Sequence, residues 1–133
     1  VDLYQDPDNA FVAGFIGSPR MNFLTATVTE RSTLSTGGIE IENPTKTRLD
    51  PGSRHLLGIR PEHLDDRSGV ALGAKVDVVE RLGSTSYVHA TLATGETVIA
   101  EKRENPPKTG DSIVLSFAPA SLRLFTESGA RVR

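Results

Sequence analysis

Cysteine and tryptophan are both absent from this chain of 133 residues. Without a thiol, the chain cannot form a disulfide, a zinc–thiolate site or a cysteine nucleophile. Aromatic residues make up only 5% of the sequence, so we expect a small core built from Val, Ile, Leu and Ala. No apolar run reaches the length that a transmembrane helix needs, and no secretory signal is visible.

Neither sign of charge dominates the composition. There are 15 Lys and Arg against 17 Asp and Glu, which gives a net charge of -2. General nucleic-acid binders usually present a basic face, and single-strand binders also stack bases on aromatic side chains. Tyr87 is the only aromatic residue in the central strands predicted below. We therefore expect no nucleic-acid partner.

Apolar and polar residues alternate along much of the chain, which predicts strands. Leu24, Ala26 and Val28 alternate with threonines, the pattern of a half-buried strand. Glycine-containing turns separate this segment from later ones. Further strands are predicted at 39–41, 75–82, 87–92, 98–99, 113–117 and 122–125. Strands at this spacing favour an all-β fold, either a sandwich or an OB-like barrel.

One short helix is predicted near the N-terminus. Asp6 can cap its first turn, and Pro7 suits the first helical position. The apolar stripe of this helix consists of Phe11, Val12, Phe15 and Ile16. A helix of about ten residues is marginal alone in water, so its stripe should pack on a partner surface.

No motif predicts an enzyme site. The segment 69–75 resembles a phosphate-binding loop, but Ala74 and Val76 stand where that loop needs its last glycine and its hydroxyl. We predict instead a loop that enters a strand. His55, His63 and His89 lack the spacing of a metal pair, and we expect each at the surface or the edge of the core.

The charged turn Arg60-Pro61-Glu62 has two readings. It follows the apolar residues Leu57 and Ile59, so it can be a strand end at which proline breaks the ladder and Arg pairs with Glu. An exposed pair of this kind contributes only ~0–1 kcal/mol. The alternative is a fixed contact that orients two domains or two subunits.

Two motifs, taken together, carry a family resemblance. Phe11-Val-Ala-Gly-Phe-Ile-Gly-Ser-Pro19, with Met21-Asn-Phe-Leu24, resembles the stretch by which maltose-type ABC transporter ATPases leave their nucleotide-binding domain. Leu57-Gly-Ile-Arg-Pro-Glu-His-Leu64 is similar to the motif that opens their regulatory β module. Val78-Val-Glu-Arg-Leu-Gly-Ser84 and Leu122-Arg-Leu-Phe125 match the rest of that module, so the resemblance covers nearly the whole chain.

The resemblance implies a transport-associated OB (TOBE) module at residues 23–133. It would follow a helical tail, residues 1–22, that leaves a missing ATPase domain. Since the chain begins at Val1 within the pattern, we expect a fragment of a longer protein. The tail residues Phe11, Val12, Phe15 and Ile16 would dock on that domain, while Arg60, Pro61, Glu62 and His63 would form interface or regulatory contacts.

The resemblance also implies the setting in which such a module works. It implies a homodimer at the inner face of the cell membrane, in contact with its own ATPase domain and, indirectly, with the membrane subunits of a sugar importer. Regulatory proteins or small effectors would dock on it in some members. Walker and signature motifs are absent from the sequence, so we expect no catalysis by this chain and no cofactor in it; ATP and Mg would bind only the missing domain.

A rival reading is a free-standing OB domain that binds a small oxyanion. Ser84-Thr-Ser86 is a candidate donor cluster for such a ligand. This reading expects saturable ligand binding without any ATPase partner.

A single charged substitution in the apolar stripe of the helix tests whether that stripe docks on the ATPase domain. In a full-length protein, Phe15→Asp should lower solubility or the coupling of ATPase activity to transport, because a carboxylate cannot be buried against the ATPase domain without cost. Turnover and solubility are measured beside the unaltered protein. Unaltered coupling in the variant would contradict docking.

Overall fold

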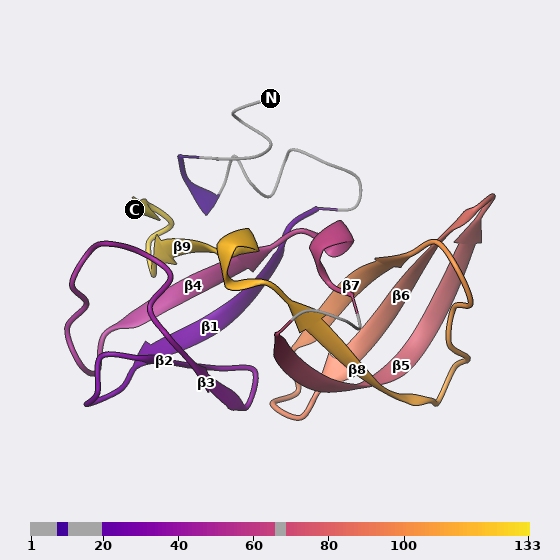
Figure 1. Ribbon diagram of the computed structural model, residues 1–133, viewed down its shortest axis with the longest axis horizontal. Helices are drawn as coiled ribbons and strands as arrows, with labels where there is room; N and C mark the ends of the chain where they lie inside the picture. The colour runs from indigo at the N-terminus through magenta and orange to yellow at the C-terminus, as the bar shows by residue number, and fades with distance from the viewer. Residues whose placement is uncertain (1–7, 11–19, 66–68) are drawn as a thin grey trace.

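The computed structural model describes residues 8–10, 20–65 and 69–133, which form ten strands and two short 3-10 helices (Figure 1). The stripe residues of the predicted helix all lie outside these ranges. The elements in chain order are β1 Asn22–Val28, β2 Leu34–Thr36, β3 Ile39–Ile41, β4 Arg54–Ile59, η1 Pro61–His63, β5 Val70–Leu82, β6 Thr85–Leu92, β7 Thr97–Lys102, β8 Ser112–Phe117, η2 Pro119–Ser121, β9 Arg123–Thr126 and β10 Arg131–Val132.

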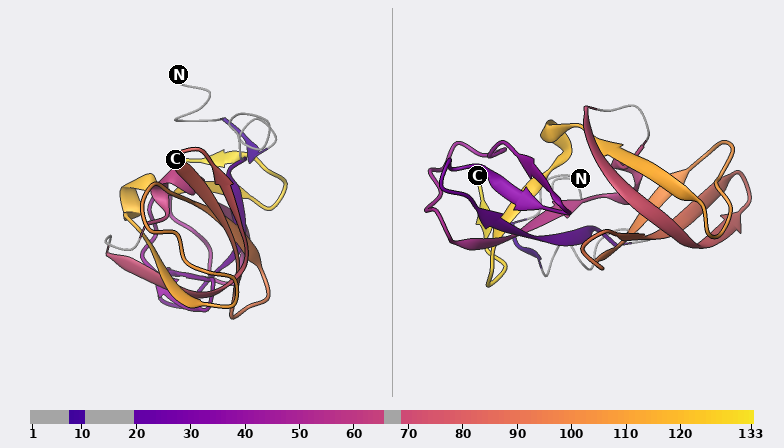
Figure 2. Two further views of the ribbon diagram at one scale, coloured as in Figure 1. Left: turned by 90° about the vertical axis from the view of Figure 1, so that its right-hand side faces the viewer. Right: turned by 90° about the horizontal axis from the view of Figure 1, so that it is seen from below.

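The strands form two antiparallel sheets. One has six strands in the order β10-β9-β4-β1-β2-β3, and the other has four in the order β7-β6-β5-β8. The two sheets lie next to each other along the long axis of the molecule, as Figures 1 and 2 both show. The predicted all-β fold is confirmed.

Both ends of the described chain contribute to the six-stranded sheet. Its centre pairs β1 with β4, and β4 then pairs with β9 from the far end of the sequence. Beyond the sheet, Asn9 forms an isolated bridge with Ala130, and the Ala10 N–H donates to the Gly129 carbonyl at 2.8 Å. The first described residues thus lie against the C-terminal hairpin. The boundary predicted between residues 22 and 23 stays a prediction, and β1 begins at Asn22.

Alternation along the strands decides which side chains enter the core. In β1, Leu24, Ala26 and Val28 are buried while Thr25 and Thr27 are exposed, as predicted. In β6, every second residue from Ser86 to Leu92 is buried. Apolar faces of both sheets join in one core, whose fully buried members include Leu57, Leu72, Val88 and Leu115. That continuity binds the two sheets into one folding unit.

The prediction of a loop at residues 69–75 is wrong. Residues 70–75 are the first half of β5, where Leu72 and Ala74 are buried and pair with Leu115 and Ile113 of β8. Small residues with a glycine among them carry little β propensity of their own. The pairing with β8, about forty positions further along, makes this segment a strand.

A bulge at Asp77 reverses the alternation of β5. Val76 pairs with Ala90 of β6, and Val78 pairs with His89, which is adjacent to Ala90 in β6. Asp77 therefore has no residue opposite it in this strand pair. Val76 is therefore buried, whereas the side chain of Val78 is 51% exposed. An extra residue of this kind moves every later side chain of the strand to the opposite face.

The β2–β3 hairpin is closed by a polar cluster at its edge. Glu40 accepts hydrogen bonds from Arg31 and from the Thr33 hydroxyl, at 2.5 and 2.6 Å. The hydrogen bond from Arg31, followed by that from Thr33, lowers the pKa of the Glu40 carboxyl below its ordinary value. A carboxyl with a lowered pKa stabilises the fold above its unfolded pKa, and this contribution is lost as the pH falls through the folded value.

Gly58 of β4 lies where no side chain fits. A Cβ at this position would lie 2.5 Å from Met21 Sδ and 3.0 Å from Phe125 Cε2. Met21 and Phe125 are buried and form a second apolar cluster on the outer face of the six-stranded sheet, where Phe125 also meets Phe23 edge to face at 5.8 Å. The glycine thus allows this cluster to pack directly on the strand.

Gly58→Ala should therefore destabilise the chain by about 1–2 kcal/mol, because the added methyl group overpacks the Met21–Phe125 cluster. Urea unfolding of both proteins measures the difference. Gly73→Ala is the matched control, since a Cβ at Gly73 in β5 would meet nothing within 4 Å. Equal stability losses in the two variants would contradict this account of Gly58.

Candidate interface at the junction of the two sheets

One asparagine joins the two sheets. Asn22 begins β1 and is buried, with 8% of its surface exposed. Its Nδ2 donates to the Ile99 carbonyl at 2.9 Å, and its Oδ1 accepts from the Ile99 N–H at 2.8 Å. Ile99 lies in β7, an edge strand of the four-stranded sheet. The side-chain amide thus takes the place of a neighbouring peptide group at this edge.

A carboxylate makes the second link between β1 and β7. Glu96, in the turn before β7, accepts from the Thr25 N–H at 2.9 Å and from the Thr25 hydroxyl at 3.1 Å. The hydroxyl of Thr94 holds the other carboxylate oxygen at 3.0 Å. Asn22 and Thr25 are three residues apart, as are Glu96 and Ile99, so the two contacts form a seam of side-chain hydrogen bonds between β1 and the edge strand β7, which runs antiparallel to it.

Backbone pairing supplies a third link on the far side of the junction. Asp65 and Ser116 exchange both backbone hydrogen bonds, at 2.8 and 2.6 Å. Asp65 follows η1, and Ser116 belongs to β8, the other edge of the four-stranded sheet. Both edges of that sheet are therefore tied to the segments that come from the six-stranded sheet.

The predicted interface residues lie at this junction. Arg60 and Pro61 are buried, Glu62 is exposed and His63 is half-buried. Pro61, Glu62 and His63 form η1, which packs against β7 and is closed by a hydrogen bond from the His63 N–H to the Arg60 carbonyl at 2.9 Å. The turn thus ends the β4 ladder next to β7, with Glu62 exposed at its surface. An interface role for these four residues stays a prediction.

The sequence does not single out the residues that carry the seam. Asn22 ends the predicted tail, and Glu96 is not among the predicted site residues. A signal is nevertheless present in both, because Asn22 lies two residues before Leu24, on the phase of the strand that is buried, and Glu96 follows the turn residue Gly95. A buried amide needs partners, and only another segment could supply them.

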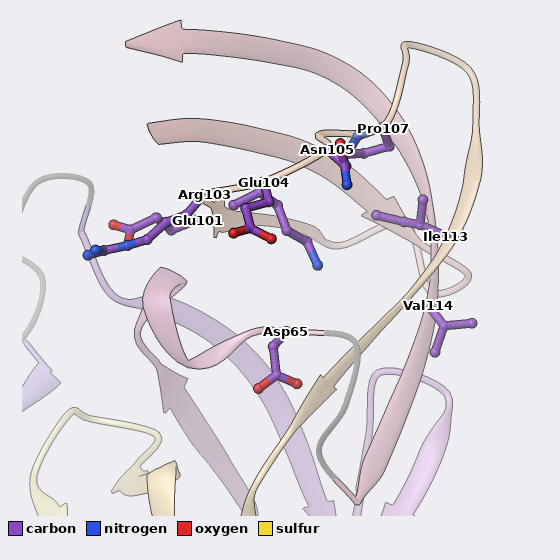
Figure 3. A pocket seen from close by; sticks show the side chains of 9 residues that line it. Asp65, Glu101, Arg103, Glu104, Asn105, Pro107, Ile113 and Val114 are labelled. Carbon is purple, nitrogen blue, oxygen red and sulfur yellow. The ribbon is translucent and has the colours of Figure 1, made fainter. Parts of the chain in front are cut away.

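A groove opens between the two edge strands of the smaller sheet (Figure 3). Its volume is about 810 Å³, and it is lined by charges of both signs. Figure 3 shows Asp65 on one side and Glu101, Arg103 and Glu104 on the other. Its lining consists of Asp65, Glu101, Lys102, Arg103, Glu104, Asn105, Pro107, Ile113 and Val114. Mixed charge without a polar cradle does not specify one ligand class.

The side chains considered for metal or oxyanion binding do not lie together at one site. Among residues 8–10, 20–65 and 69–133, no three His, Asp or Glu side chains lie close enough to hold a metal ion. Of the predicted donor cluster, Ser84 is exposed in the turn after β5, while Ser86 is buried on the inner phase of β6. His55 is buried in β4 and His89 contacts Glu80 on the surface, so the histidines are also dispersed.

The described ranges contain no helix long and apolar enough to cross a bilayer.

Two family models match the chain and meet at this junction. Residues 17–64 match the MalK OB fold domain, and residues 57–125 match the TOBE domain. Their shared segment, 57–64, is the end of β4 together with η1. The OB-like character predicted from the sequence is confirmed, and so is the resemblance to sugar-importer ATPases.

Curated relatives match over nearly all of the chain. It is 43% identical over 98% of its length to the lactose transport ATP-binding protein of Rhizobium radiobacter. It is 37% identical over 99% to the sn-glycerol-3-phosphate import ATP-binding protein of Ruegeria pomeroyi, and 33% identical over 100% to the maltose/maltodextrin import ATP-binding protein of Salmonella typhimurium. The chain spans 39%, 37% and 39% of the length of these three proteins.

A solved structure shares the fold at low sequence identity. The cytoplasmic molybdate-binding protein ModG superposes with a TM-score of 0.61 at 15% identity, over 79% of this chain and 95% of that one. Similarity at this level concerns the fold alone.

Asn22→Ala should destabilise the chain by about 1–2 kcal/mol, because it leaves the half-buried N–H and carbonyl of Ile99 without their protein partner. Hydrogen exchange at the Ile99 amide should quicken more than exchange within β1. Thr27→Ala is the control, since Thr27 lies exposed on the same strand. Unchanged exchange at Ile99 in the Asn22 variant would show that the Asn22 amide does not hold the edge of β7.

Proposed function

Because the chain belongs to the TOBE domain family and carries a MalK-type OB fold domain before the TOBE match, we propose that it is the regulatory and dimerisation module of an importer's ATP-binding subunit. The full-length subunit would be an ABC transporter ATPase, and this module would be its non-catalytic part. The observation that carries the proposal is the match of three importer ATP-binding proteins to 98–100% of the chain.

The mechanism of such a module is mechanical. A contact between two copies that does not require nucleotide keeps two ATPase domains close together, which raises their effective concentration through each cycle. A partner that prefers one arrangement of the two modules shifts the balance between open and closed states. The links at the junction support this role, because they hold both sheets as one body that can transmit a displacement.

The proposal assigns roles to the predicted residues. Arg60 and Pro61 fix the turn that joins the two sheets, and Glu62 and His63 present its surface to a neighbouring domain or regulatory protein. The N-terminal stripe would dock on the ATPase domain, where ATP and Mg would bind. The subunit would lie in the cytoplasm, attached to the inner face of the membrane through the transporter's membrane subunits.

The rival remains an oxyanion-binding OB domain. The fold shared with a molybdate-binding protein favours it. The positions of Ser84 and Ser86 weigh against it, because one hydroxyl faces solvent and the other faces the core.

A chimera tests the proposal. The matching segment of the Rhizobium radiobacter lactose transport ATP-binding protein is replaced by this chain, and the control protein ends before that segment. We expect the chimera to sediment as a dimer without nucleotide and to hydrolyse ATP, whereas the shortened control should be monomeric without nucleotide, because it lacks the nucleotide-independent contact.

Either of two results would contradict the proposal. The first is a chimera that stays monomeric without nucleotide, like the shortened control. The second is saturable binding of molybdate by the isolated chain in calorimetry, which would put the oxyanion reading first.

A further inference from the structure

Exposed apolar surface is concentrated on the four-stranded sheet. Among the residues that the structure describes, three large apolar side chains are exposed: Val78 at 51%, Leu82 at 59% and Val114 at 55%. Val78 and Leu82 lie in the C-terminal half of β5, and Val114 lies in the neighbouring strand β8. The six-stranded sheet has no large apolar side chain exposed to this degree among its described residues.

These side chains share the outer face of the sheet. Residues directly opposite each other in an antiparallel pair lie on the same face. Val78 and Glu80 of β5 face His89 and Tyr87 of β6, which alternate with the buried Val88 and Ala90. Lys75 faces Thr91, the next outward residue of β6. The Asp77 bulge is the reason that Val78 and Glu80 lie on the same side as Lys75.

Small residues make the same face flat next to Val114. Val114 pairs with Gly73, where an added Cβ would meet nothing within 4 Å, and Ala71 is exposed two residues earlier. A flat apolar patch with short side chains can be approached closely by another sheet, as in sheet-on-sheet packing at about 10 Å.

Charges of opposite sign flank Val78 along β5. Lys75 lies on one side of Val78 along β5, and Glu80 lies on the other. They are about 15 Å apart at the rise of an extended strand. A second copy packed with its β5 antiparallel would place each Lys75 against the Glu80 of the other copy, with the two Val78 side chains near the axis. Opposite charges at the two ends make this face self-complementary.

We propose that the outer face of the four-stranded sheet is the surface on which two copies of this chain associate about a two-fold axis. The inference rests on the dimerisation proposed above and assigns it to Val78, Val114, Lys75 and Glu80. In such an isologous contact each charged pair occurs twice, so one substitution acts at two places. Glu80 also contacts His89 of its own copy, which holds its carboxylate on this face.

Asp77 is the one unfavourable group near the axis. It is exposed, and its carboxylate accepts a hydrogen bond from the Thr91 hydroxyl at 2.6 Å, which turns it towards β6. The two Asp77 carboxylates would repel each other across the axis. Asp77→Asn should therefore tighten the dimer, by about two- to fivefold in Kd, since surface charges are partly screened.

A charge swap on the chain tests the surface. Sedimentation equilibrium gives the dimer Kd of the wild-type protein, Lys75→Glu, Glu80→Lys and the doubly substituted protein. Each single substitution places like charges opposite each other twice and should weaken the dimer by about tenfold or more. The double substitution restores opposite charges and should recover most of the wild-type affinity.

Two controls separate the surface from general effects. Lys46→Glu makes the same charge change at an exposed site near the six-stranded sheet, and it should leave the Kd unchanged. Thermal unfolding checks that each variant is folded, which the exposure of Lys75 and Glu80 leads us to expect.

The possible failures are distinct. A wild-type chain that stays monomeric at all concentrations would overturn both the surface and the proposed dimerisation. A wild-type dimer that both single variants leave intact, or that the double variant fails to restore, would overturn the surface alone.

Discussion

The buried side-chain amide of Asn22 is the link between the two sheets on which the edge strand β7 depends. The edge of a sheet presents N–H and carbonyl groups that need partners once they are covered, and a strand normally supplies them. Here Asn22 supplies both for Ile99, because a side-chain amide carries the same donor and acceptor as a peptide group. The position of η1 against β7, and hence the placement of Glu62 and His63, depends on β7 being held at this edge.

The sequence predicts the regular strands well and the junction poorly. β1 and β6 are half-buried over six or more residues, so their alternation shows in the sequence and also in the structure. β10 has only two residues, too few to show any period. The first half of β5 was missed because its strand character comes from its pairing with β8. Long-range pairing of this kind leaves no local pattern.

The sequence likewise indicates one part of the candidate site and not the rest. The turn after β4 was found from its proline and its charges, and it does lie at the junction of the sheets. Burial of Arg60 at 3% exposure could not be read from composition, because arginine is usually a surface residue. The exposure of Val78 was also hidden, because it depends on a one-residue bulge. Both features depend on departures from the regular strand period, which a search for periodic patterns passes over.

Both ends of the described chain belong to the same sheet, and this order has a consequence during synthesis. β4 is synthesised before the whole of the smaller sheet, and its partner β9 is synthesised after it. The smaller sheet lies entirely between them in sequence, so it can be completed first. Until β9 has emerged, β4 presents an open strand edge on that side. An open edge of this kind is a site at which a nascent chain can pair with its neighbours.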